Sequence, residues 1–300
     1  MTKSTSRRSF LTTSAGLAGT AIASGPAALN LAAQEAQKAK KGQKAQKVEL
    51  PKKTYDLKLG ACSYSFRKFS RADCIKMTRQ LNTPYINIKE FHLLYKSTPE
   101  ELAAGRKEFE DAGLIIVGGG TISLQKDDDA DMRMYFEYAK AAGMPLMVIA
   151  PTKETVPRIE KFVKEYNIKA AIHNHGPEDK HFPSPYDVLE VVQGRDPRMG
   201  LCMDVGHTTR TGKDVVKALA DAGSRLLDVH IKDLADLMVS GSQCDVGDGM
   251  MPVVAIFKQL KRMNFQGYVN LEYEINADAP LVGMQKSFSY MRGVLDALKA

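Results

Sequence analysis

Residues 199–233 have the sequence MGLCMDVGHTTRTGKDVVKALADAGSRLLDVHIKD. This stretch begins and ends with short apolar runs, residues 199–206 and 226–233. Between them, residues 213–222 carry apolar side chains at helical spacing. Gly223 follows the helical segment, at the position where a glycine commonly ends a helix. A strand, a helix and a second strand in this order form a parallel pair, so the stretch predicts one β/α unit.

The same unit recurs along most of the chain, with helical spacing also in residues 100–111, 129–142 and 253–263. Eight such units favour a closed parallel barrel, because closure leaves no exposed sheet edge. The sequence therefore predicts an α/β fold, a single (β/α)8 TIM barrel that forms the catalytic domain over residues 54–300. The eight strand candidates are residues 57–66, 85–91, 114–122, 146–151, 169–175, 199–206, 226–233 and 268–274.

An open, doubly wound sheet is the competing interpretation. It requires a glycine-rich phosphate loop after the first strand, but residues 62–65 have the sequence CSYS, without glycine. The run Gly118-Gly119-Gly120 lies in or just after the third strand candidate. We expect it to allow close approach of backbone or substrate, so the barrel is favoured.

The first 53 residues are predicted to lie outside the barrel. Residues 6–11 have the twin-arginine pattern SRRSFL, followed by a short apolar stretch and the small-residue site AIA at 21–23. This order predicts a twin-arginine export signal over residues 1–33 and a periplasmic or otherwise exported protein. The apolar stretch is too short for stable membrane insertion. Residues 34–53, rich in Lys, Gln and Ala, predict a basic disordered linker.

The positive net charge of the chain comes from this N-terminal part. Residues 1–53 carry ten Lys or Arg and two Asp or Glu, whereas the remaining residues carry 32 basic and 33 acidic groups. The barrel thus has no cationic excess, which argues against a nucleic-acid partner. The spacing of the four cysteines fits neither a zinc knuckle nor a disulfide scaffold. Cys62 and Cys202 lie in apolar runs and are predicted to be buried thiols.

Polar side chains accumulate where the strand candidates end, which is the end of a barrel that carries chemistry. Each of strand candidates five to eight carries an imidazole or a carboxylate at its carboxyl end. A single histidine or aspartate has a structural explanation, such as a helix cap for Asp204. Four successive strands are better explained by a divalent metal, because two imidazoles and two carboxylates suit Mn, Zn, Fe or Co. The predicted metal ligands are His173, Asp204, His230 and Glu272.

The residues that end these strands resemble the xylose isomerase-like TIM barrel family, over about residues 57–298. The segments that carry the resemblance are AIHNH at 171–175, DVGH at 204–207, DVHIKD at 228–233, VGDG at 246–249 and GYVNLEYE at 267–274. The chain is most similar to the exported, twin-arginine branch described as sugar phosphate isomerase/epimerase. The resemblance implies a metal-dependent isomerase or epimerase that acts on a small-molecule carbohydrate.

The ketose epimerases of that family hold their metal with a Glu, an Asp, a His and a second Glu. Asp204, His230 and Glu272 match the last three ligands, but His173 stands where the first Glu is expected. The two glutamates of those epimerases also act as base and acid. The substitution therefore leaves a symmetric two-glutamate mechanism in doubt here.

A mechanism that tolerates this substitution removes a proton next to a carbonyl group that a metal polarises. Glu272 or Glu274 is the candidate base, and His175, His207 or Lys232 the candidate acid. Candidate substrate-binding residues are Lys89, His92, Asn174 and Asp248. Because sugar phosphates are mainly cytosolic and few arginines lie at the strand ends, we expect an unphosphorylated sugar or keto-sugar.

Three alternatives stay open at this point. The first is a lyase that eliminates the leaving oxygen of a keto-glycoside, which needs only one base and one acid. The second is a phosphodiesterase similar to endonuclease IV, which the charge of the barrel and the number of ligands disfavour. The third is a non-catalytic exported sugar-binding barrel. The sequence does not name the sugar, the metal or the oligomeric state.

Overall fold

The computed structural model describes residues 55–299. Within them, parallel strands close into a barrel in the order β1-β10-β7-β6-β5-β4-β3-β2, which confirms the predicted (β/α)8 TIM barrel. The eight barrel strands are β1 (Lys58–Cys62), β2 (Tyr85–Ile88), β3 (Ile115–Leu124), β4 (Leu146–Pro151), β5 (Lys169–His173), β6 (Met199–Asp204), β7 (Leu226–Ile231) and β10 (Tyr268–Leu271).

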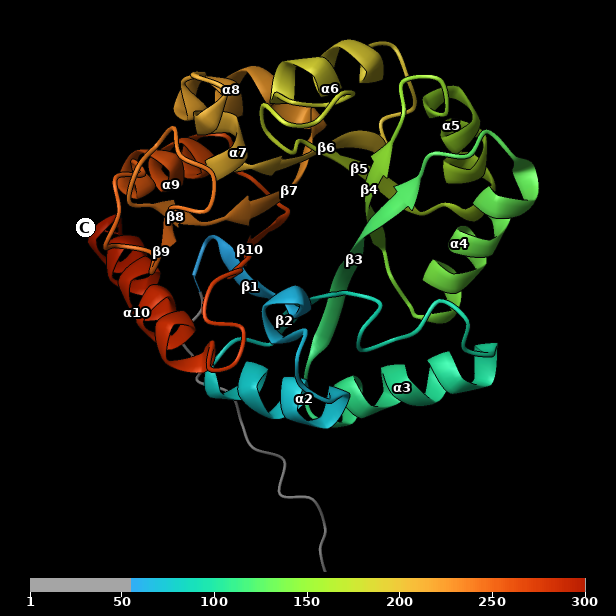
Figure 1. Ribbon diagram of the computed structural model, residues 1–300, viewed down its shortest axis with the longest axis horizontal. Helices are drawn as coiled ribbons and strands as arrows, with labels where there is room; N and C mark the ends of the chain where they lie inside the picture. Colours follow the sequence, from blue (N-terminus) through green and yellow to red (C-terminus); the bar gives the residue numbers. More distant parts are fainter. Residues whose placement is uncertain (1–54, 300) are drawn as a thin grey trace, which may run out of the picture. The chain divides into compact units, whose positions relative to one another are not determined.

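Helices form a ring outside the strands (Figure 1). The helices of this ring are α2 (Arg71–Gln80), α3 (Pro99–Asp111), α4 (Asp129–Ala141), α5 (Val156–Tyr166), α6 (Pro185–Val192), α8 (Val215–Ala222), α9 (Val253–Arg262) and α10 (Leu281–Ala297). Shorter elements lie in the connections: the 3-10 helices η1 (Ser63–Phe66) and η2 (Gly223–Arg225), helix α7 (Val205–Arg210) and the antiparallel pair β8 (Asp233–Leu234) and β9 (Gln243–Cys244).

Local sequence signals explain where the outer helices begin and end. Thr98 and Glu101 form a capping box that starts α3, with Pro99 in the first turn. Gly113 and Gly143 follow α3 and α4 at φ +77° and +70°, a backbone conformation that a side chain disfavours. Both helices therefore end at a glycine in the left-handed conformation.

The strands have two buried faces of different character. Side chains such as Met147 and Ile149 point outward and belong to the large core shared with the helices. The inward-pointing Leu146, Val148 and Ala171 belong to a much smaller apolar cluster. Closer to the carboxyl ends of the strands the interior becomes polar, and the buried side chains there include Asn87, His173, Asp204, Asp228, His230 and Asn270.

Six strands end earlier than predicted, namely β1, β2, β5, β6, β7 and β10. One hydrogen bond accounts for the first two. β1 ends at Cys62 and continues as η1, whereas a strand to residue 66 was expected. β2 ends at Ile88, whereas a strand to residue 91 was expected. The Lys89 amide donates to Ser63 Oγ at 2.7 Å, so a side chain takes the place of the next ladder bond. The chain then turns, with the His92 amide donating to the Lys89 carbonyl at 3.0 Å.

The predicted export signal (residues 1–33) and linker (residues 34–53) lie outside the described residues. Among the described helices, none is both long and apolar enough to cross a bilayer. Cys62 and Cys202 are buried free thiols, as predicted, and burial raises the pKa of the Cys62 thiol to about 11. The two other cysteines, Cys74 and Cys244, are free thiols as well.

Candidate active site

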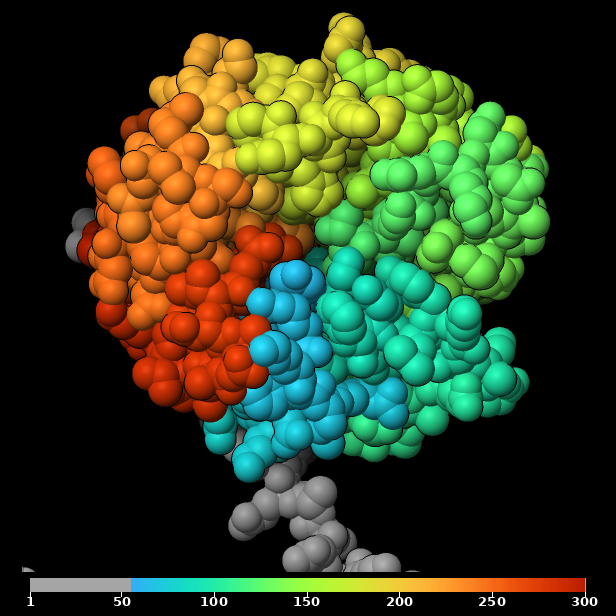
Figure 2. All heavy atoms as spheres, in the orientation of Figure 1, coloured from blue at the N-terminus to red at the C-terminus, as the bar shows by residue number. Residues whose placement is uncertain are grey.

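A polar cavity of about 200 Å³ opens at the carboxyl ends of the strands. Figure 2 shows a narrow hollow at the centre of one face of the barrel, between segments far apart in the sequence. Five of the predicted catalytic or metal-binding residues line the cavity, together with one predicted substrate-binding residue, one glycine of the predicted glycine run and two residues that the sequence did not single out. The lining residues are Tyr64, Lys89, Gly120, Thr121, His173, His175, His207, Glu272 and Glu274.

The four predicted metal ligands converge at the floor of this cavity. One donor atom from each of His173, Asp204, His230 and Glu272 lies within 4.8 Å of the others. His173 Nε2 is 3.1 Å from His230 Nδ1 and 3.7 Å from Asp204 Oδ2, and His230 Nδ1 is 3.4 Å from Glu272 Oε1. Donors about 2.1 Å from one tetrahedral metal lie about 3.4 Å apart. The spacing of these four residues therefore fits a divalent metal.

Two of the four floor residues already have the protonation state that a metal requires. Burial and the neighbouring His175 and His230 rings hold the pKa of His173 well below its usual value, so its imidazole is neutral. Burial favours the protonated form of Glu272, but the Lys232 ammonium and the His230 imidazole hold its pKa well below the usual range. A neutral imidazole and an ionised carboxylate are the forms that bind metals. The third, His230, would have to release a proton: burial favours its neutral form, but Cys202, Cys62 and Glu272 raise its pKa well above the usual value.

Asp204 caps a helix, as the sequence suggested, and its second oxygen lies where a metal ligand is expected. Its Oδ1 accepts a hydrogen bond from the His207 amide at 2.8 Å and so caps α7, while Oδ2 faces the floor of the cavity. Asn174 holds the backbone of this residue: its Oδ1 accepts from the Asp204 amide at 3.0 Å and its Nδ2 donates to the Asp204 carbonyl. Asn174 was predicted to bind substrate, but it is fully buried and is not among the lining residues.

Lys232 lies among three carboxylates. Its Nζ is 2.9 Å from Asp204 Oδ2, 2.9 Å from Glu272 Oε2 and 2.6 Å from Glu274 Oε2. Burial opposes the charged form, but Asp204, Glu272 and Glu274 raise the pKa of Lys232 well above its usual value. The ammonium is thus a permanent charge that balances two candidate metal ligands and a possible base.

Gln243 fixes the strand end that carries two of these carboxylates. Its Nε2 donates to the Glu272 carbonyl at 2.6 Å, and its Oε1 accepts from the Glu274 amide at 2.9 Å. The side chain therefore replaces a neighbouring strand beyond the end of β10. Tyr273, between the two glutamates, donates from its hydroxyl to Asp245 Oδ1 at 2.6 Å. Gln243 lies on the two-residue strand β9 and Asp245 follows it, in the connection between β7 and α9, where the barrel periodicity gave no signal for them.

The loop that contains Gln243 is organised by Asp233, which follows the predicted acid Lys232. The buried Asp233 carboxylate accepts hydrogen bonds from the amides of Leu234, Gly247, Gly249 and Met251, at 2.9–3.3 Å. Asp248, a predicted substrate-binding residue, lies in this loop. Its carboxylate pairs with Lys286 of α10 and is not among the cavity lining.

The imidazoles of His175 and His207 form one wall of the cavity, with ring centroids 5.9 Å apart. His175 Nδ1 is 3.2 Å from Asp179 Oδ2, and burial together with His207 lowers the pKa of His175. Burial favours the neutral form of Asp179, but the amides of Phe182 and His181 outweigh it and lower its pKa. His175 is thus a neutral base oriented by an ionised carboxylate, which the sequence did not reveal because Asp179 lies in a loop.

The remaining predicted substrate-binding residues differ in position. Lys89 lines the cavity and donates from Nζ to the Thr121 carbonyl at 2.7 Å, which ties β2 to β3. His92 is buried outside the cavity, and burial lowers its pKa. The predicted close approach at the glycine run is found at Gly120, which lines the cavity beside Thr121.

A second polar layer lies beneath the floor. The buried Asp228 accepts hydrogen bonds from Asn270 Nδ2 at 2.9 and 3.1 Å, and its Oδ2 is 3.9 Å from His230 Nε2. Burial raises the pKa of Asp228 to about 7, although His230 and Asn270 oppose the shift. A carboxylate behind a metal-binding histidine commonly sets the orientation of the imidazole.

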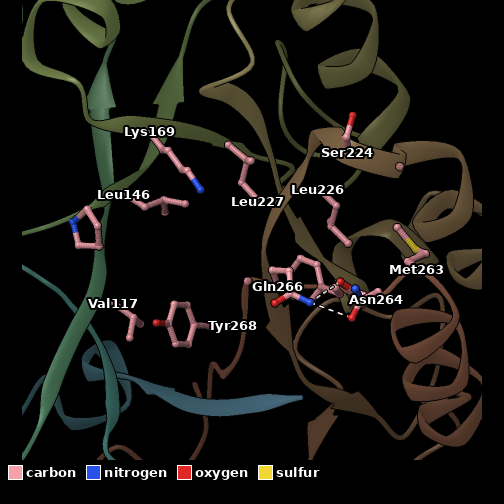
Figure 3. Close-up of a pocket in the computed structure, with 14 residues that line it drawn as sticks. Val117, Leu146, Lys169, Ser224, Leu226, Leu227, Met263, Asn264, Gln266 and Tyr268 are labelled. Atoms are coloured by element: carbon pink, nitrogen blue, oxygen red, sulfur yellow. Dashed lines mark hydrogen bonds between the residues drawn. The ribbon is translucent and has the colours of Figure 1, made fainter. Parts of the chain in front are cut away.

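A larger cavity, about 490 Å³, lies at the opposite end of the strands. Figure 3 shows Leu146, Leu227 and Tyr268 around its open space, with Lys169 at one side. It gathers no cluster of carboxylates and imidazoles from the described residues that line it. The chemistry of the barrel therefore belongs to the smaller, polar cavity.

The comparisons with known proteins identify the family. A model of the xylose isomerase-like TIM barrel family matches residues 14–293, so the chain belongs to this family. No curated protein sequence matches the chain.

Solved structures of related proteins share the fold. An uncharacterised protein from Parabacteroides distasonis is 27% identical, with a TM-score of 0.63 over 79% of this chain and 99% of that one. The probable 3-DHS dehydratase from Bacillus anthracis is 14% identical, with a TM-score of 0.66 over the same shares. The 3-keto-D-glucoside 4-epimerase from E. coli is 18% identical, with a TM-score of 0.65, again over 79% and 99%.

Proposed function

We propose that the chain is a metal-dependent isomerase or epimerase that acts on an unphosphorylated sugar or keto-sugar by proton abstraction next to a carbonyl group. One observation carries the proposal. The donors of His173, Asp204, His230 and Glu272 meet at the floor of a cavity whose walls carry a further carboxylate and two imidazoles. Membership of a family whose solved relatives include a sugar epimerase and a dehydratase supports it.

A bound divalent metal would supply Lewis acidity to a carbonyl oxygen and an adjacent hydroxyl, which acidifies the neighbouring C–H bond. The protein supplies the proton carriers. Glu274 is the most exposed of the carboxylates around Lys232, with 41% of its side chain accessible, and it reaches the cavity. Glu272 is held ionised by Lys232 and His230 and belongs to the proposed metal ligands, whereas Glu274 lies outside that set. We therefore assign proton abstraction to Glu274 in preference to Glu272.

The imidazole wall returns the proton. His175 is neutral and oriented by Asp179, and His207 lies beside it, so either ring can exchange a proton with a substrate oxygen or carbon near neutral pH. Lys232 Nζ contacts the Glu274 carboxylate at 2.6 Å and fixes its position. Because the surrounding carboxylates stabilise its ammonium form, we assign Lys232 a positioning role and not that of the acid.

The lining supports an unphosphorylated substrate. Of the described residues that line the cavity, none is an arginine, and the lysine among them, Lys89, already donates to the Thr121 carbonyl. A bidentate guanidinium clamp for phosphate is therefore missing from this lining.

Proton abstraction is tested with the manganese-loaded protein in D2O, with D-fructose, D-psicose and a 3-keto-glucoside as substrates. Proton NMR should show deuterium entering the carbon next to the carbonyl, together with a new isomer or epimer. The Glu274→Gln variant should lose this exchange and keep its metal. Exchange at an unchanged rate in the variant would refute the assignment of Glu274, and no exchange by the wild type would refute the proposed reaction.

A lyase that acts on keto-glycosides is the second candidate. His173 stands where a glutamate base is expected in the ketose epimerases, which leaves Glu274 opposite imidazoles and not opposite a second carboxylate. One base and one acid suffice for elimination. The base takes the proton next to the carbonyl, the electron pair forms a C=C bond, and the β C–O bond breaks as the leaving oxygen is protonated. Release of 4-nitrophenol from a 3-keto-glucoside of that phenol would identify this outcome.

We also propose export by the twin-arginine route, on the pattern SRRSFL at residues 6–11. Replacement of Arg7 and Arg8 by lysine should keep the protein in the cytoplasm with its N-terminal segment uncleaved, as cell fractionation and mass spectrometry would reveal. Cleavage and export at the normal level would refute this route.

A further inference from the structure

One side of the cavity mouth carries an aromatic pair that the proton-transfer chemistry does not use. Tyr64 lies on η1 and lines the cavity, and the Phe91 ring lies outside it, with its centroid 6.1 Å from that of Tyr64. The two ring planes are inclined at 44°. Phe91 is 44% exposed, so much of a large apolar ring faces solvent at the mouth of a polar cavity.

The backbone around these rings is fixed by several contacts. The Arg67 guanidinium lies 4.6 Å from the centroid of the Tyr64 ring and donates to the Glu274 carbonyl at 2.7 Å. Phe91 lies within a hydrogen-bonded turn that is closed by His92, whose buried ring anchors the loop from below. The rings are thus presented by an ordered frame, which limits the conformational entropy that binding would cost.

The size of the cavity suggests what Tyr64 and Phe91 bind. At about 200 Å³ it lies below the range of about 300–1,000 Å³ for pockets that bury drug-sized ligands, and a single sugar ring fits it. A group attached to that ring must extend beyond the cavity, and the exposed Phe91 ring lies next to Tyr64, which lines it. Sugar and aryl rings both offer C–H edges or faces that pack favourably on an exposed aromatic ring.

We propose that Tyr64 and Phe91 form a subsite for the aglycone of a glycoside, so that the substrate is a keto-glycoside and not a free monosaccharide. The inference rests on the proposed function, because it places the reacting sugar ring in the cavity. It names the substrate class: one ring over the metal ligands, joined through a glycosidic oxygen to a second pyranose or aryl ring on Phe91.

The test measures binding of unreactive probes to the manganese-loaded protein by calorimetry. The probes are D-glucose, methyl β-D-glucoside and 4-nitrophenyl β-D-glucoside. The wild type should bind the nitrophenyl glucoside about three- to tenfold more tightly than the methyl glucoside. Phe91→Ala should abolish this preference and leave the affinity for glucose unchanged, whereas Phe91→Tyr should retain it.

Leu94→Ala is the matched control, because Leu94 is an exposed apolar residue of the same loop, 60% accessible. It should leave all three affinities unchanged. Equal binding of the two glucosides by the wild type, or a preference that survives in Phe91→Ala, would overturn the subsite. Failure of all three probes to bind would also overturn the subsite, whereas the proposed function fails on absent proton exchange in D2O, so the two failures are distinguishable.

Discussion

Gln243 offers the most informative single substitution, because it touches neither substrate nor metal in this account. Gln243→Ala removes two hydrogen bonds to the strand end that carries Glu272 and Glu274, at 2.6 and 2.9 Å. Each intramolecular hydrogen bond contributes about 0.5–1.5 kcal/mol net, so the substitution should lower the free energy of unfolding by about 1–3 kcal/mol. At about 2–4 °C per kcal/mol, the melting temperature should fall by about 2–12 °C.

The metal site should weaken as well. Glu272 is a candidate ligand, and loss of a residue that orients a ligand typically lowers metal affinity about 10–100-fold. The Glu272 amide still donates to the Ile231 carbonyl at 3.1 Å, which limits the displacement, so we expect the lower end of that range. Manganese titrated into the protein and followed by calorimetry measures the change.

Gln285→Ala serves as the control for this substitution. Gln285 makes the same kind of side-chain contact, a 3.4 Å bond to the Gln80 carbonyl, on an exposed part of α10. It should change neither stability nor metal affinity appreciably. Weakened metal binding in Gln285→Ala, or undiminished binding in Gln243→Ala, would refute the reasoning that the loop positions the glutamates.

Three further substitutions test separate parts of the site. Glu274→Gln should lower kcat at least 100-fold and leave manganese affinity within about twofold, since this carboxylate is outside the ligand set; loss of manganese would contradict its role. Lys232→Met leaves buried carboxylates uncompensated and should destabilise the metal-free protein by about 3–5 kcal/mol, with an unusually large gain in melting temperature on adding manganese; a gain like that of the wild type would contradict the charge balance. Asp179→Asn removes the carboxylate that raises the pKa of His175, so the falling limb of the pH–rate profile, which reports the acid, should move to lower pH, and an unmoved falling limb would exclude His175 as the acid.

Ionisation of Asp179 is expected to stabilise the folded protein, so acid should remove this contribution to the free energy of unfolding. Its carboxyl pKa is lowered in the folded protein, so it stabilises the fold above the pKa of the unfolded chain, about 3.9. This stabilisation should be lost as the pH falls through the folded value. In Asp179→Asn, acid unfolding followed by circular dichroism should therefore begin from a lower stability at pH 6 and show a weaker dependence between pH 5 and 3.

The parts of the fold that follow a simple period were predictable from the sequence. Apolar runs separated by helical segments predicted the barrel, and the ends of the strand candidates predicted that His173, Asp204, His230 and Glu272 would meet. This works because parallel strands in a barrel end at one rim, so polar residues at equivalent depth must meet.

Loops and strand ends were not predictable in the same way. Gln243 contacts the backbone of residues 29 and 31 positions further along the chain. Asp179 contacts His175, four residues before it. Neither position follows from the period of a strand or a helix. Asn174 lies between two predicted site residues, but its side-chain amide is hydrogen-bonded to the backbone of Asp204. The ends of β1 and β2 depend on Ser63, whose hydroxyl replaces a ladder bond.

The central claim is that four side chains at the barrel floor hold a catalytic metal. The most direct measurement is elemental mass spectrometry of the purified protein, wild type and His230→Ala, after incubation with manganese, zinc, iron or cobalt and removal of free ions. The account predicts about one equivalent of a divalent metal in the wild type and its loss in the folded variant. Absence of metal from the wild type, or equal metal in both proteins, would contradict it.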